Sequence, residues 1–464
     1  MSGKRRLMAI QPAISGIVRS HTSFNGLRKS IAYLPPLSVA GSRLPRRPAV
    51  QTRQYATNNS AAISDPDAKT PLYDLHASYG AKFVPFGGYV MPVQYSDLSV
   101  GESHKWTREK ASIFDVSHMV QNRLTGPLAI EFLETITPAE PAVLAPFTST
   151  LSALLKPSPR EGGIIDDCVI VRLGPEEFYF VTNAGCREKD HAYLSSELKR
   201  FHTKHGDAPK WEILEGKGLI ALQGPLAGQI LEDALAGTDK AKLGGLYFGC
   251  SMYGKVTLPT GQSSDLLISR AGYTGEDGFE ISIPAEETTA VTQFLLESAG
   301  KEKLRLAGLG ARDSLRLEAG MCLYGHDLNE DITPPEAALS WIVGKSRREK
   351  GGFYGADTIN KQILGVKKGG SPIEKRRIGL IVEGAPAREG MTIHDDTGAE
   401  VGVITSGCPS PTLGKNIAMG YIKDGMHKSG TEVQVKVRSK MRKATVSKMP
   451  FVPSKYHKPA APPS

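Results

Sequence analysis

A glutamate that follows a glycine-rich turn is the most distinctive chemical feature of this chain. Glycines at positions 272, 275 and 278 fall within seven residues, and glycine supplies the positive-φ positions that tight turns require. Residues 265–270 before the turn and 279–283 after it are expected to form strands. Phe279, Ile281 and Ile283 alternate with polar residues, which predicts a half-buried strand with Glu280 directed away from its apolar face.

A carboxylate at the start of a strand, beside such a turn, can take part in ligand recognition. It can accept paired hydrogen bonds from an amino group and an adjacent N–H, the edge that a pterin or a guanidinium presents. The spacing alone favours a simpler interpretation, in which Glu280 is a solvated residue on the outer face of the strand.

A pair of aspartates forms a second group that could do chemistry. Asp166 and Asp167 follow two glycines and open a β-rich run, and residues 162–183 are predicted to form a hairpin. Adjacent residues of a strand point to opposite faces, so at most one of the two can address a given pocket directly. The pattern alone is more typical of turn residues at a strand entrance.

An arginine pair stands on a predicted helix that ends at Gly320. Arg312 and Arg316 are four residues apart and share a helical face, which is typical of a solvated or salt-bridged surface. The alternative is an anchor for a ligand. Glycines 308 and 310 do not make a dinucleotide motif, because the third glycine is missing, and the chain contains no G-x-x-x-x-G-K-[ST] phosphate loop.

A third group, Asp115, Ser117 and His118, contains the residue types of a hydrolytic triad. Triads are defined by spatial geometry, which nearness in sequence does not provide. We therefore expect packing roles at the end of a strand for these residues.

Composition and charge limit the function classes. The 464 residues are enough for roughly two or three domains, and no apolar stretch of about 18 residues predicts a membrane span. Residues 1–64 hold ten Lys or Arg and no acid, which leaves 47 basic and 48 acidic residues in the rest of the chain. The net charge of +9 therefore gives no support for nucleic-acid binding by the folded part.

The basic, Ser-rich segment at 1–55 has the composition of a mitochondrial transit peptide, with a disordered basic arm as the alternative. The five cysteines are widely scattered, without a C-x-x-C pair. This spacing argues against a zinc site and a disulfide framework and suits a reducing compartment.

The order of predicted elements favours an α+β fold over a doubly wound sheet, because hairpins are interspersed with helices such as the one expected at 187–202. After a linker at 365–377 the pattern is β throughout, which predicts a small C-terminal β-barrel. The proline-rich end from Tyr456 is expected to be loosely held.

Several long motifs, taken together and in order, resemble the T-protein family of the glycine cleavage system, the mitochondrial aminomethyltransferases. The similarity runs from about Leu72 to Tyr456. The motifs are Asp115-Val-Ser-His-Met119, Gly162-Gly-Ile-Ile-Asp-Asp167, Thr182-Asn-Ala-Gly185, Leu222-Gln-Gly-Pro225, Gly272-Tyr-Thr-Gly-Glu-Asp-Gly-Phe-Glu280, Ala311-Arg-Asp-Ser-Leu-Arg-Leu-Glu-Ala-Gly320, Leu323-Tyr-Gly325, Thr405-Ser-Gly-Cys-Pro-Ser-Pro411, Ala418-Met-Gly-Tyr421 and Val446-Ser-Lys-Met-Pro-Phe-Val-Pro453.

The resemblance implies a three-domain cloverleaf around a central folate cavity, with two interleaved domains at 72–345 and the barrel at 376–456. It implies transfer of an aminomethyl group from the dihydrolipoyl arm of H-protein to tetrahydrofolate, giving 5,10-methylenetetrahydrofolate and ammonia. Tetrahydrofolate would be a co-substrate, with no metal and no flavin. The implied partners are lipoylated H-protein and the P- and L-proteins, in the mitochondrial matrix, without nucleic acid.

The resemblance also assigns residues. Asp167 corresponds to a catalytic aspartate near folate N10, Glu280 to a pterin-binding glutamate, and Arg312 and Tyr456 to further folate contacts, with Asn183 in the matching Asn-Ala-Gly stretch. The choice of Asp167 over Asp166 comes from the resemblance. A carboxylate there would stabilise a cationic iminium-like carbon and orient the folate nitrogen, and most of the rate gain would come from bringing two carriers into register.

Three alternatives share this fold. The folate domains of dimethylglycine and sarcosine dehydrogenases follow a flavin domain, whereas only a leader precedes the fold here. A folate-dependent iron–sulfur assembly factor carries a Lys-Gly-Cys-Tyr-x-Gly-Gln-Glu stretch, which this chain lacks. A non-catalytic folate-binding accessory protein would keep the same pocket, and H-protein-dependent activity distinguishes it.

Overall fold

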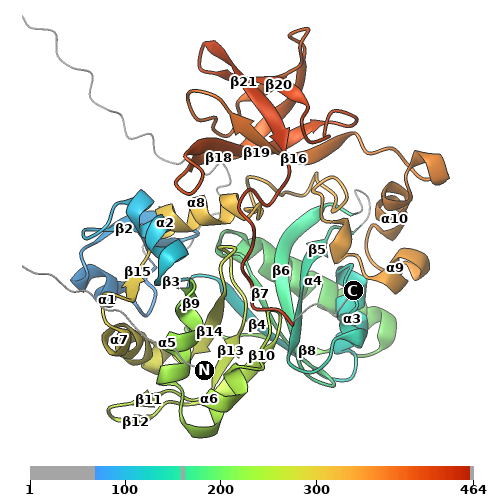
Figure 1. Cartoon of the computed structure of the whole chain (residues 1–464). Coiled ribbons are helices and arrows are strands. Elements are labelled where there is room, and N and C mark those ends of the chain that lie inside the picture. Colours follow the sequence, from blue (N-terminus) through green and yellow to red (C-terminus); the bar gives the residue numbers. More distant parts are fainter. Residues whose placement is uncertain (1–67, 158–161, 460–464) are drawn as a thin grey trace, which may run out of the picture. The chain divides into compact units, whose positions relative to one another are not determined.

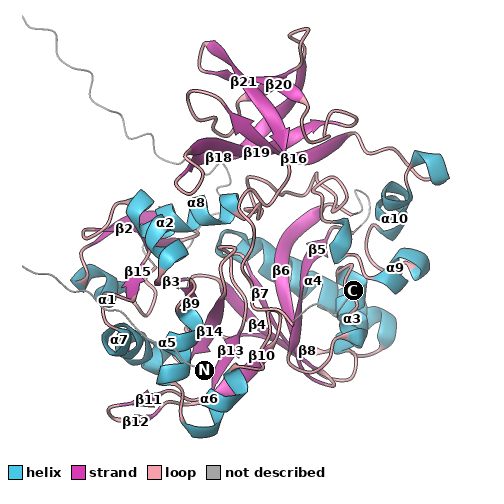
Figure 2. Cartoon of the chain, viewed as in Figure 1, coloured by secondary structure: helices cyan, strands magenta, loops and turns pink. Residues whose placement is uncertain are grey.

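The computed structural model describes residues 68–157 and 162–459 of the chain (Figure 1). The leader expected at 1–55 lies outside these described residues. Helices are interspersed with runs of consecutive strands along the described chain (Figure 2), and the sheets are largely antiparallel, which confirms the predicted α+β class. Within this part of the chain, no helix is long and apolar enough to cross a membrane.

The first sheet has six strands and is antiparallel except for one pair at its edge, β3 and β15, which run parallel. In spatial order its strands are β10 (Ser251–Gly254), β13 (Leu266–Ser269), β14 (Gly278–Ile283), β9 (Gly218–Gln223), β3 (Ala111–Asp115) and β15 (Leu304–Leu306).

The second sheet has five strands and is antiparallel throughout. Its strands in spatial order are β5 (Thr148–Leu155), β6 (Ile164–Gly174), β7 (Glu177–Thr182), β4 (Val120–Thr125) and β8 (Lys210–Ile213). All of them lie between β3 and β9 in the sequence, so the second sheet is inserted between two neighbouring strands of the first. The hairpin predicted at 162–183 is the β6–β7 pair.

Helices and short hairpins complete the two sheets. The helices are α1 (Tyr73–Ser78), α2 (Val100–Glu109), α3 (Ala129–Ile136), α4 (Arg187–His205), α5 (Ala227–Ala234), α6 (Gly237–Leu243), α7 (Thr288–Ala299), α8 (Leu309–Glu318), α9 (Lys345–Lys350) and α10 (Ala356–Leu364). The short hairpins are β1 (Ala81–Phe86) with β2 (Tyr89–Tyr95) and β11 (Thr257–Leu258) with β12 (Gly261–Gln262). The helix predicted at 187–202 is α4.

Each sheet buries one face beneath its own helices. Phe279 and Ile281 of β14 belong to the same buried cluster as side chains of α5 and α7, and Phe178 and Phe180 of β7 pack with side chains of α3 and α4. Burying such apolar side chains is the main favourable contribution to folding. The other faces of the two sheets meet each other, where Tyr179 and Val171 contact Leu267.

The polar face of β14 is less exposed to solvent than the sequence predicted. The strand was expected to be half-buried with one solvated face, but Ser282 is only 2% exposed. The polar positions of β14 face the second sheet, because that sheet covers the side of the first sheet not occupied by helices. Glu280 is half-buried on this face and lines the space between the sheets, so it does not lie on an open outer face as the simpler interpretation expected.

The predicted C-terminal barrel is confirmed as a closed six-stranded barrel. Its strands in spatial order are β16 (Lys375–Val382), β19 (Lys415–Lys423), β18 (Glu400–Ser410), β17 (Thr392–His394), β20 (Glu432–Val437) and β21 (Lys440–Ser447). Helix α8 contacts this barrel through Arg316, which donates a hydrogen bond to the hydroxyl of Ser406 at 2.9 Å.

The end of the chain is held against the first sheet rather than loose. The N–H of Lys455 donates to the carbonyl of Gly275 at 2.8 Å, and the carbonyl of His457 accepts from the N–H of Phe248 at 2.8 Å. The expectation of a loose end from Tyr456 is wrong as far as residue 459, because these backbone groups find partners in the glycine-rich turn and a neighbouring loop.

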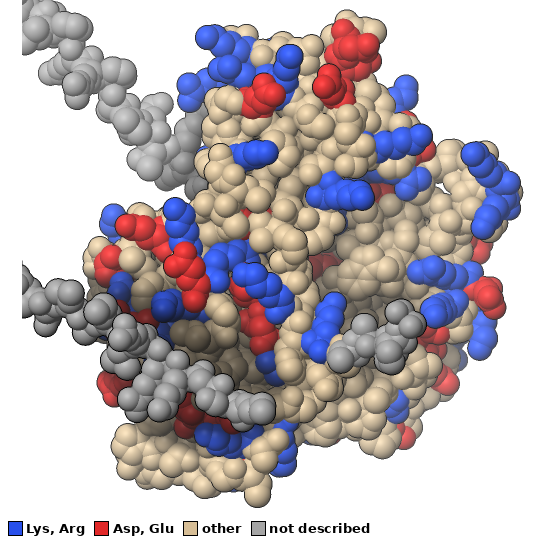
Figure 3. Space-filling view, viewed as in Figure 1, with Lys and Arg blue, Asp and Glu red and all other residues tan. Residues whose placement is uncertain are grey.

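Charge and cysteine usage agree with the sequence. Basic and acidic side chains are interspersed over the face of the molecule in view (Figure 3). All five cysteines are free, so the expectation of no disulfide framework is confirmed.

Candidate active site between the two sheets

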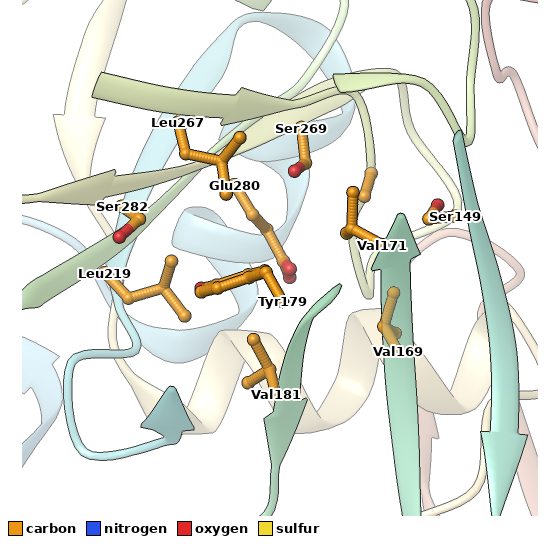
Figure 4. Close-up of a pocket in the computed structure, with 11 residues that line it drawn as sticks. Ser149, Val169, Val171, Tyr179, Val181, Leu219, Leu267, Ser269, Glu280 and Ser282 are labelled. Atoms are coloured by element: carbon orange, nitrogen blue, oxygen red, sulfur yellow. The ribbon is translucent and has the colours of Figure 1, made fainter. Parts of the chain in front are cut away.

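A cavity lies between the two sheets, on the faces that carry no helices. Figure 4 shows that the Glu280 carboxylate extends from β14 into this space toward Tyr179. Both sheets line the cavity, through Ser149, Val169, Val171, Tyr179 and Val181 of the second sheet and Leu219, Leu267, Ser269, Glu280 and Ser282 of the first, together with Ala271.

Glu280 enters the cavity because of strand alternation. Phe279 and Ile281 are fully buried in the core, so the intervening side chain must point to the other face. Burial raises the pKa of Glu280, and the nearby Arg312 opposes this rise. Its carboxylate forms no hydrogen bond with any residue that the structure describes, and it is therefore available to accept hydrogen bonds from a ligand.

Arg312 on α8 supplies the opposite charge. Its guanidinium lies over the ring of Tyr273, 4.7 Å from the centroid, and its Nη1 is buried without a hydrogen-bond partner. Burial lowers the pKa of Arg312, while the Glu280 charge raises it. A buried, unsatisfied guanidinium nitrogen is costly, which makes Arg312 a natural partner for an acceptor on a bound molecule. Arg316 instead forms an ion pair with Asp327 at 2.7 Å.

The two aspartates of β6 occupy different environments. Asp167 shares a strand face with Val169 and Val171, which line the cavity. Asp166 shares the opposite face with Cys168 and Ile170 and is fully buried. The prediction that at most one of the pair can address a given pocket is confirmed.

Asn183 connects the two aspartates. It precedes the short 3-10 helix Ala184–Cys186, which leads directly into α4. Its side-chain Nδ2 donates to Asp166 Oδ1 at 2.8 Å and to Asp167 Oδ1 at 2.9 Å, and its backbone N–H donates to Asp166 Oδ2 at 2.8 Å. Both protons of the amide are therefore used, and the Asp167 carboxyl is held in one orientation.

Asp167 combines burial with a neighbouring negative charge. Burial first, and the charge of Asp166 second, raise the pKa of Asp167 to about 7, whereas the hydrogen bond from Asn183 lowers it. A carboxyl group whose pKa lies near neutrality can exchange protons during a reaction.

Tyr456 lies beside the cavity rather than in its lining. Its ring stacks on Phe248, with centroids 4.0 Å apart and the planes inclined by 19°. The adjoining Gly249 carbonyl accepts a hydrogen bond from the backbone N–H of Ser149, a lining residue, at 2.7 Å. Of the five expected residues, Glu280 lines the cavity. Asp167 lies on the strand face that carries two lining valines, with Asn183 bonded to it. Arg312 interacts electrostatically with Glu280, and Tyr456 lies to the side.

Sequence reasoning missed two tyrosines of this site. Tyr179 alternates on β7 with the buried Phe178 and Phe180, a signal that would have placed it on the cavity face. Its hydroxyl donates to Gln121 Oε1 at 3.0 Å, and Ser282 donates to the same oxygen at 2.6 Å, so Gln121 links the two sheets. Tyr273 lies within the glycine-rich turn, where its spacing carried no signal; its hydroxyl donates to the carbonyl of Cys322.

The residues with triad types do not form a triad. Asp115 accepts from Thr70 at 2.6 Å and contacts Nε2 of His76 at 2.9 Å. The Ser117 hydroxyl donates to the carbonyl of Leu219 at 3.2 Å. The packing roles expected for this segment are confirmed.

One buried cluster in the described residues has metal-ligand atom types. Asp166, Cys186 and Asp190 each place one oxygen or sulfur within 4.8 Å of the others. Burial raises the pKa of all three groups and so favours their protonated forms.

These features define an α+β protein in which the carboxyl group of Glu280 faces a pocket between two sheets. Comparison with known families identifies it further. The model described as GCVT N-terminal domain matches residues 72–347, and the model described as Glycine cleavage T-protein C-terminal barrel domain matches residues 375–453. The chain therefore belongs to the glycine cleavage T-protein family, and membership implies folate use.

Individual relatives agree. The chain is 46% identical over 410 residues to a probable mitochondrial aminomethyltransferase of Schizosaccharomyces pombe, covering 88% of this chain and 98% of the relative. It is 41% identical to the mitochondrial aminomethyltransferase of Mus musculus, covering 93% and 99%. The crystal structure of the glycine cleavage system aminomethyltransferase T from Bartonella henselae superposes with a TM-score of 0.73 at 38% identity, covering 84% of this chain and 99% of that one.

Proposed function

We propose that this chain transfers the aminomethyl carbon from the dihydrolipoyl arm of H-protein to tetrahydrofolate, giving 5,10-methylenetetrahydrofolate and ammonia. The observation that carries the proposal is the Glu280 carboxyl group in the lining of the cavity, with Asp167 on the face of β6 that carries two lining valines, in a chain that belongs to the T-protein family. The family resemblance provides the reaction, and the geometry provides residues suited to it.

In this proposal the cavity holds the pterin ring. Glu280 accepts hydrogen bonds from the amino group and ring N–H of the pterin, and Arg312 contributes the donor that is buried without a partner. Tyr456 contacts folate from the C-terminal segment, and Asn183 holds the Asp167 carboxyl through its 2.9 Å hydrogen bond.

Asp167 acts as the catalytic residue near folate N10. The C–S bond breaks with its electrons going to sulfur, which leaves a cationic, iminium-like carbon that a carboxylate stabilises. The bonds from this carbon to N5 and N10 form, ammonia leaves, and the two N–H protons of folate are transferred to the thiolate and the amine. The transferred carbon has the same oxidation level in donor and product, so the reaction requires no flavin. In this proposal Asp167 stabilises the positive charge, and no metal is needed for that role.

The remaining assignments follow from the same proposal. Residues 1–55 would direct the chain to the mitochondrial matrix as a transit peptide, 72–345 would form the folate-binding region, and 376–456 the barrel domain. Lipoylated H-protein would be the direct partner, with the P- and L-proteins in the same system, and no nucleic acid would be bound.

The test is H-protein-dependent turnover. Ammonia release and methylenetetrahydrofolate formation are measured with aminomethyl-loaded H-protein, for the mature chain and for Asp167→Asn. Tetrahydrofolate-dependent product from the wild type, with a large loss in a variant that still binds folate, supports the proposal. A wild-type protein that binds folate without forming product would instead be a folate-binding accessory protein.

A further inference from the structure

A third carboxyl group stands behind the Asp166–Asn183–Asp167 unit, on helix α4. Asp190 is 3% exposed, and neither of its side-chain oxygens accepts a hydrogen bond from any residue that the structure describes. One of these oxygens lies within 4.8 Å of a carboxylate oxygen of Asp166. A buried carboxyl group without donors is costly when ionised, so its place beside a second buried carboxyl group requires an explanation.

The hydrogen bonds show which of the two carboxyl groups carries the negative charge. Asp166 accepts from the backbone N–H and from the side-chain amide of Asn183, each at 2.8 Å. Asp190 accepts from no described donor. Hydrogen bonds to a carboxylate favour its ionised form, and two adjacent buried carboxylates disfavour double ionisation. The negative charge therefore belongs to Asp166 and the proton to Asp190.

The other groups around Asp190 are consistent with a protonated Asp190. Lys189 is the nearby cation, but its ammonium donates to the Tyr324 hydroxyl at 2.6 Å and lies 3.6 Å from Glu330. The buried Thr182 hydroxyl faces Asp190 as a potential donor, although it makes no hydrogen bond of good geometry with any described residue. Burial and the charge of Asp166 both raise the pKa of Asp190, while Lys189 and Thr182 lower it. The thiols Cys168 and Cys186 also face the pair, and burial raises the pKa of each.

The other groups around Asp167 contribute little net charge to its environment. Asp327 raises its pKa only as the last of the contributions, and it is neutralised by the ion pair with Arg316 at 2.7 Å. Tyr273 and Cys322 also face Asp167, and burial raises the pKa of both, so both are neutral near neutral pH. Asp166 is thus the charge that acts most strongly on Asp167.

We propose that Asp190 is a positioning residue that holds a proton behind Asp166 and so maintains the hydrogen-bonded arrangement of Asp166, Asn183 and Asp167. The proposal rests on the role of Asp167 in the proposed function. With Asp190 neutral, Asp166 remains an anion and holds both N–H groups of Asn183, and Asn183 orients the Asp167 carboxyl. The charge of Asp166 also helps to keep the pKa of Asp167 near neutrality.

Two substitutions separate this role from simple packing. Asp190→Leu replaces the proton donor with a larger apolar side chain, so Asp166 takes up the proton itself and no longer opposes ionisation of Asp167. In a plot of kcat against pH, the acid limb, where activity falls as Asp167 takes up a proton, should then move to lower pH by about one unit. Asp190→Asn supplies a neutral N–H donor in place of the protonated carboxyl group and should restore the wild-type position of this limb.

Glu197→Leu is the matched control. Glu197 is a buried carboxyl group on the same helix, but it accepts from the Tyr354 hydroxyl at 2.5 Å and is not among the groups that shift the pKa of Asp167. Its replacement should lower the melting temperature without moving the acid limb. If Asp190→Leu leaves the limb in place, Asp190 only packs. If Asp190→Asn moves the limb as far as Asp190→Leu does, Asp190 acts as an anion. Either outcome overturns the proposal.

Infrared difference spectroscopy provides a readout that needs no turnover. At about pH 9, where a carboxyl group with a pKa near 7 is ionised, the wild type should retain a protonated carboxyl band that is missing from Asp190→Asn. Persistence of the band in that variant overturns the proposal, as does a stoichiometric metal ion that is lost with the substitution. Failure of the proposed function would appear separately, as wild-type protein without H-protein-dependent product.

Discussion

Asp166 and Asp167 are neighbours on β6, yet they point to opposite faces of the second sheet. Asp166 is fully buried toward the helices, whereas Asp167 shares a face with two cavity-lining valines. The Asn183 amide bonds to both. One side chain thus connects the interior of the protein to the site, and a substitution on either side should have distinct effects.

Replacement of Asp167 by Asn should abolish most of the transfer activity. The amide keeps the shape of the side chain but cannot provide the negative charge that stabilises a cationic carbon. We expect kcat to fall by about 10²- to 10³-fold, with tetrahydrofolate affinity changed only a few-fold. Single-turnover kinetics with loaded H-protein and equilibrium folate binding measure the two effects, and an equal loss in both would contradict a role in the chemical step.

The same substitution should change the pH dependence of stability. The folded-state pKa of Asp167 is raised from its usual 3.8 to about 7, so the folded protein holds a proton that the unfolded chain has released. The stability associated with this proton is fully present below the unfolded pKa and is lost as the pH rises through about 7.

Asp167→Asn cannot lose that contribution. Relative to the wild type, the variant should therefore become more stable as the pH rises from about 4 to about 7, with no further change above this range. Melting temperatures of both proteins across this range provide the measurement. A difference that is independent of pH would contradict the raised pKa.

Replacement of Glu280 by Gln should weaken folate binding more than it slows catalysis. Gln keeps the volume but exchanges one acceptor for a donor, so a charge-assisted pair of hydrogen bonds with the pterin edge is lost. The loss should be about 1.5–3 kcal/mol, or roughly a 10- to 100-fold increase in Kd. Calorimetric titration with tetrahydrofolate tests this, with Glu197→Gln as a control that should bind normally.

The contact between α8 and the barrel should depend on one ion pair. Asp327 accepts from Arg316 at 2.7 Å and is 1% exposed, so Asp327→Asn removes the buried counter-ion of a buried guanidinium. We expect a loss of about 3–5 kcal/mol in the free energy of unfolding. Asp313, 51% exposed, contacts the same arginine at 2.9 Å, and Asp313→Asn should cost less than about 1 kcal/mol. Equal losses in denaturant melts would contradict this account.

Local patterns were enough to predict much of the chain. Turn glycines and alternating apolar residues predicted the β6–β7 hairpin, the β14 strand and the barrel, because these elements depend on short-range geometry and on which residues avoid water. Strand alternation also showed that only one of Asp166 and Asp167 can face a pocket. Long motifs that match the T-protein family indicated which of the two it would be.

Tertiary structure decided what the other face of each strand meets. The alternation of apolar and polar residues around Glu280 is the same whether the polar face of the strand meets water or a cavity. That face is covered only because the second sheet is inserted between β3 and β9. The environment of Asp190 likewise depends on where α4 packs, since its oxygens lie near Asp166 through contacts that no local pattern encodes. Burial, and with it the pKa of a carboxyl group, arises from residues distant in sequence, so the sequence indicated which groups could react and the assembled fold determined their charge.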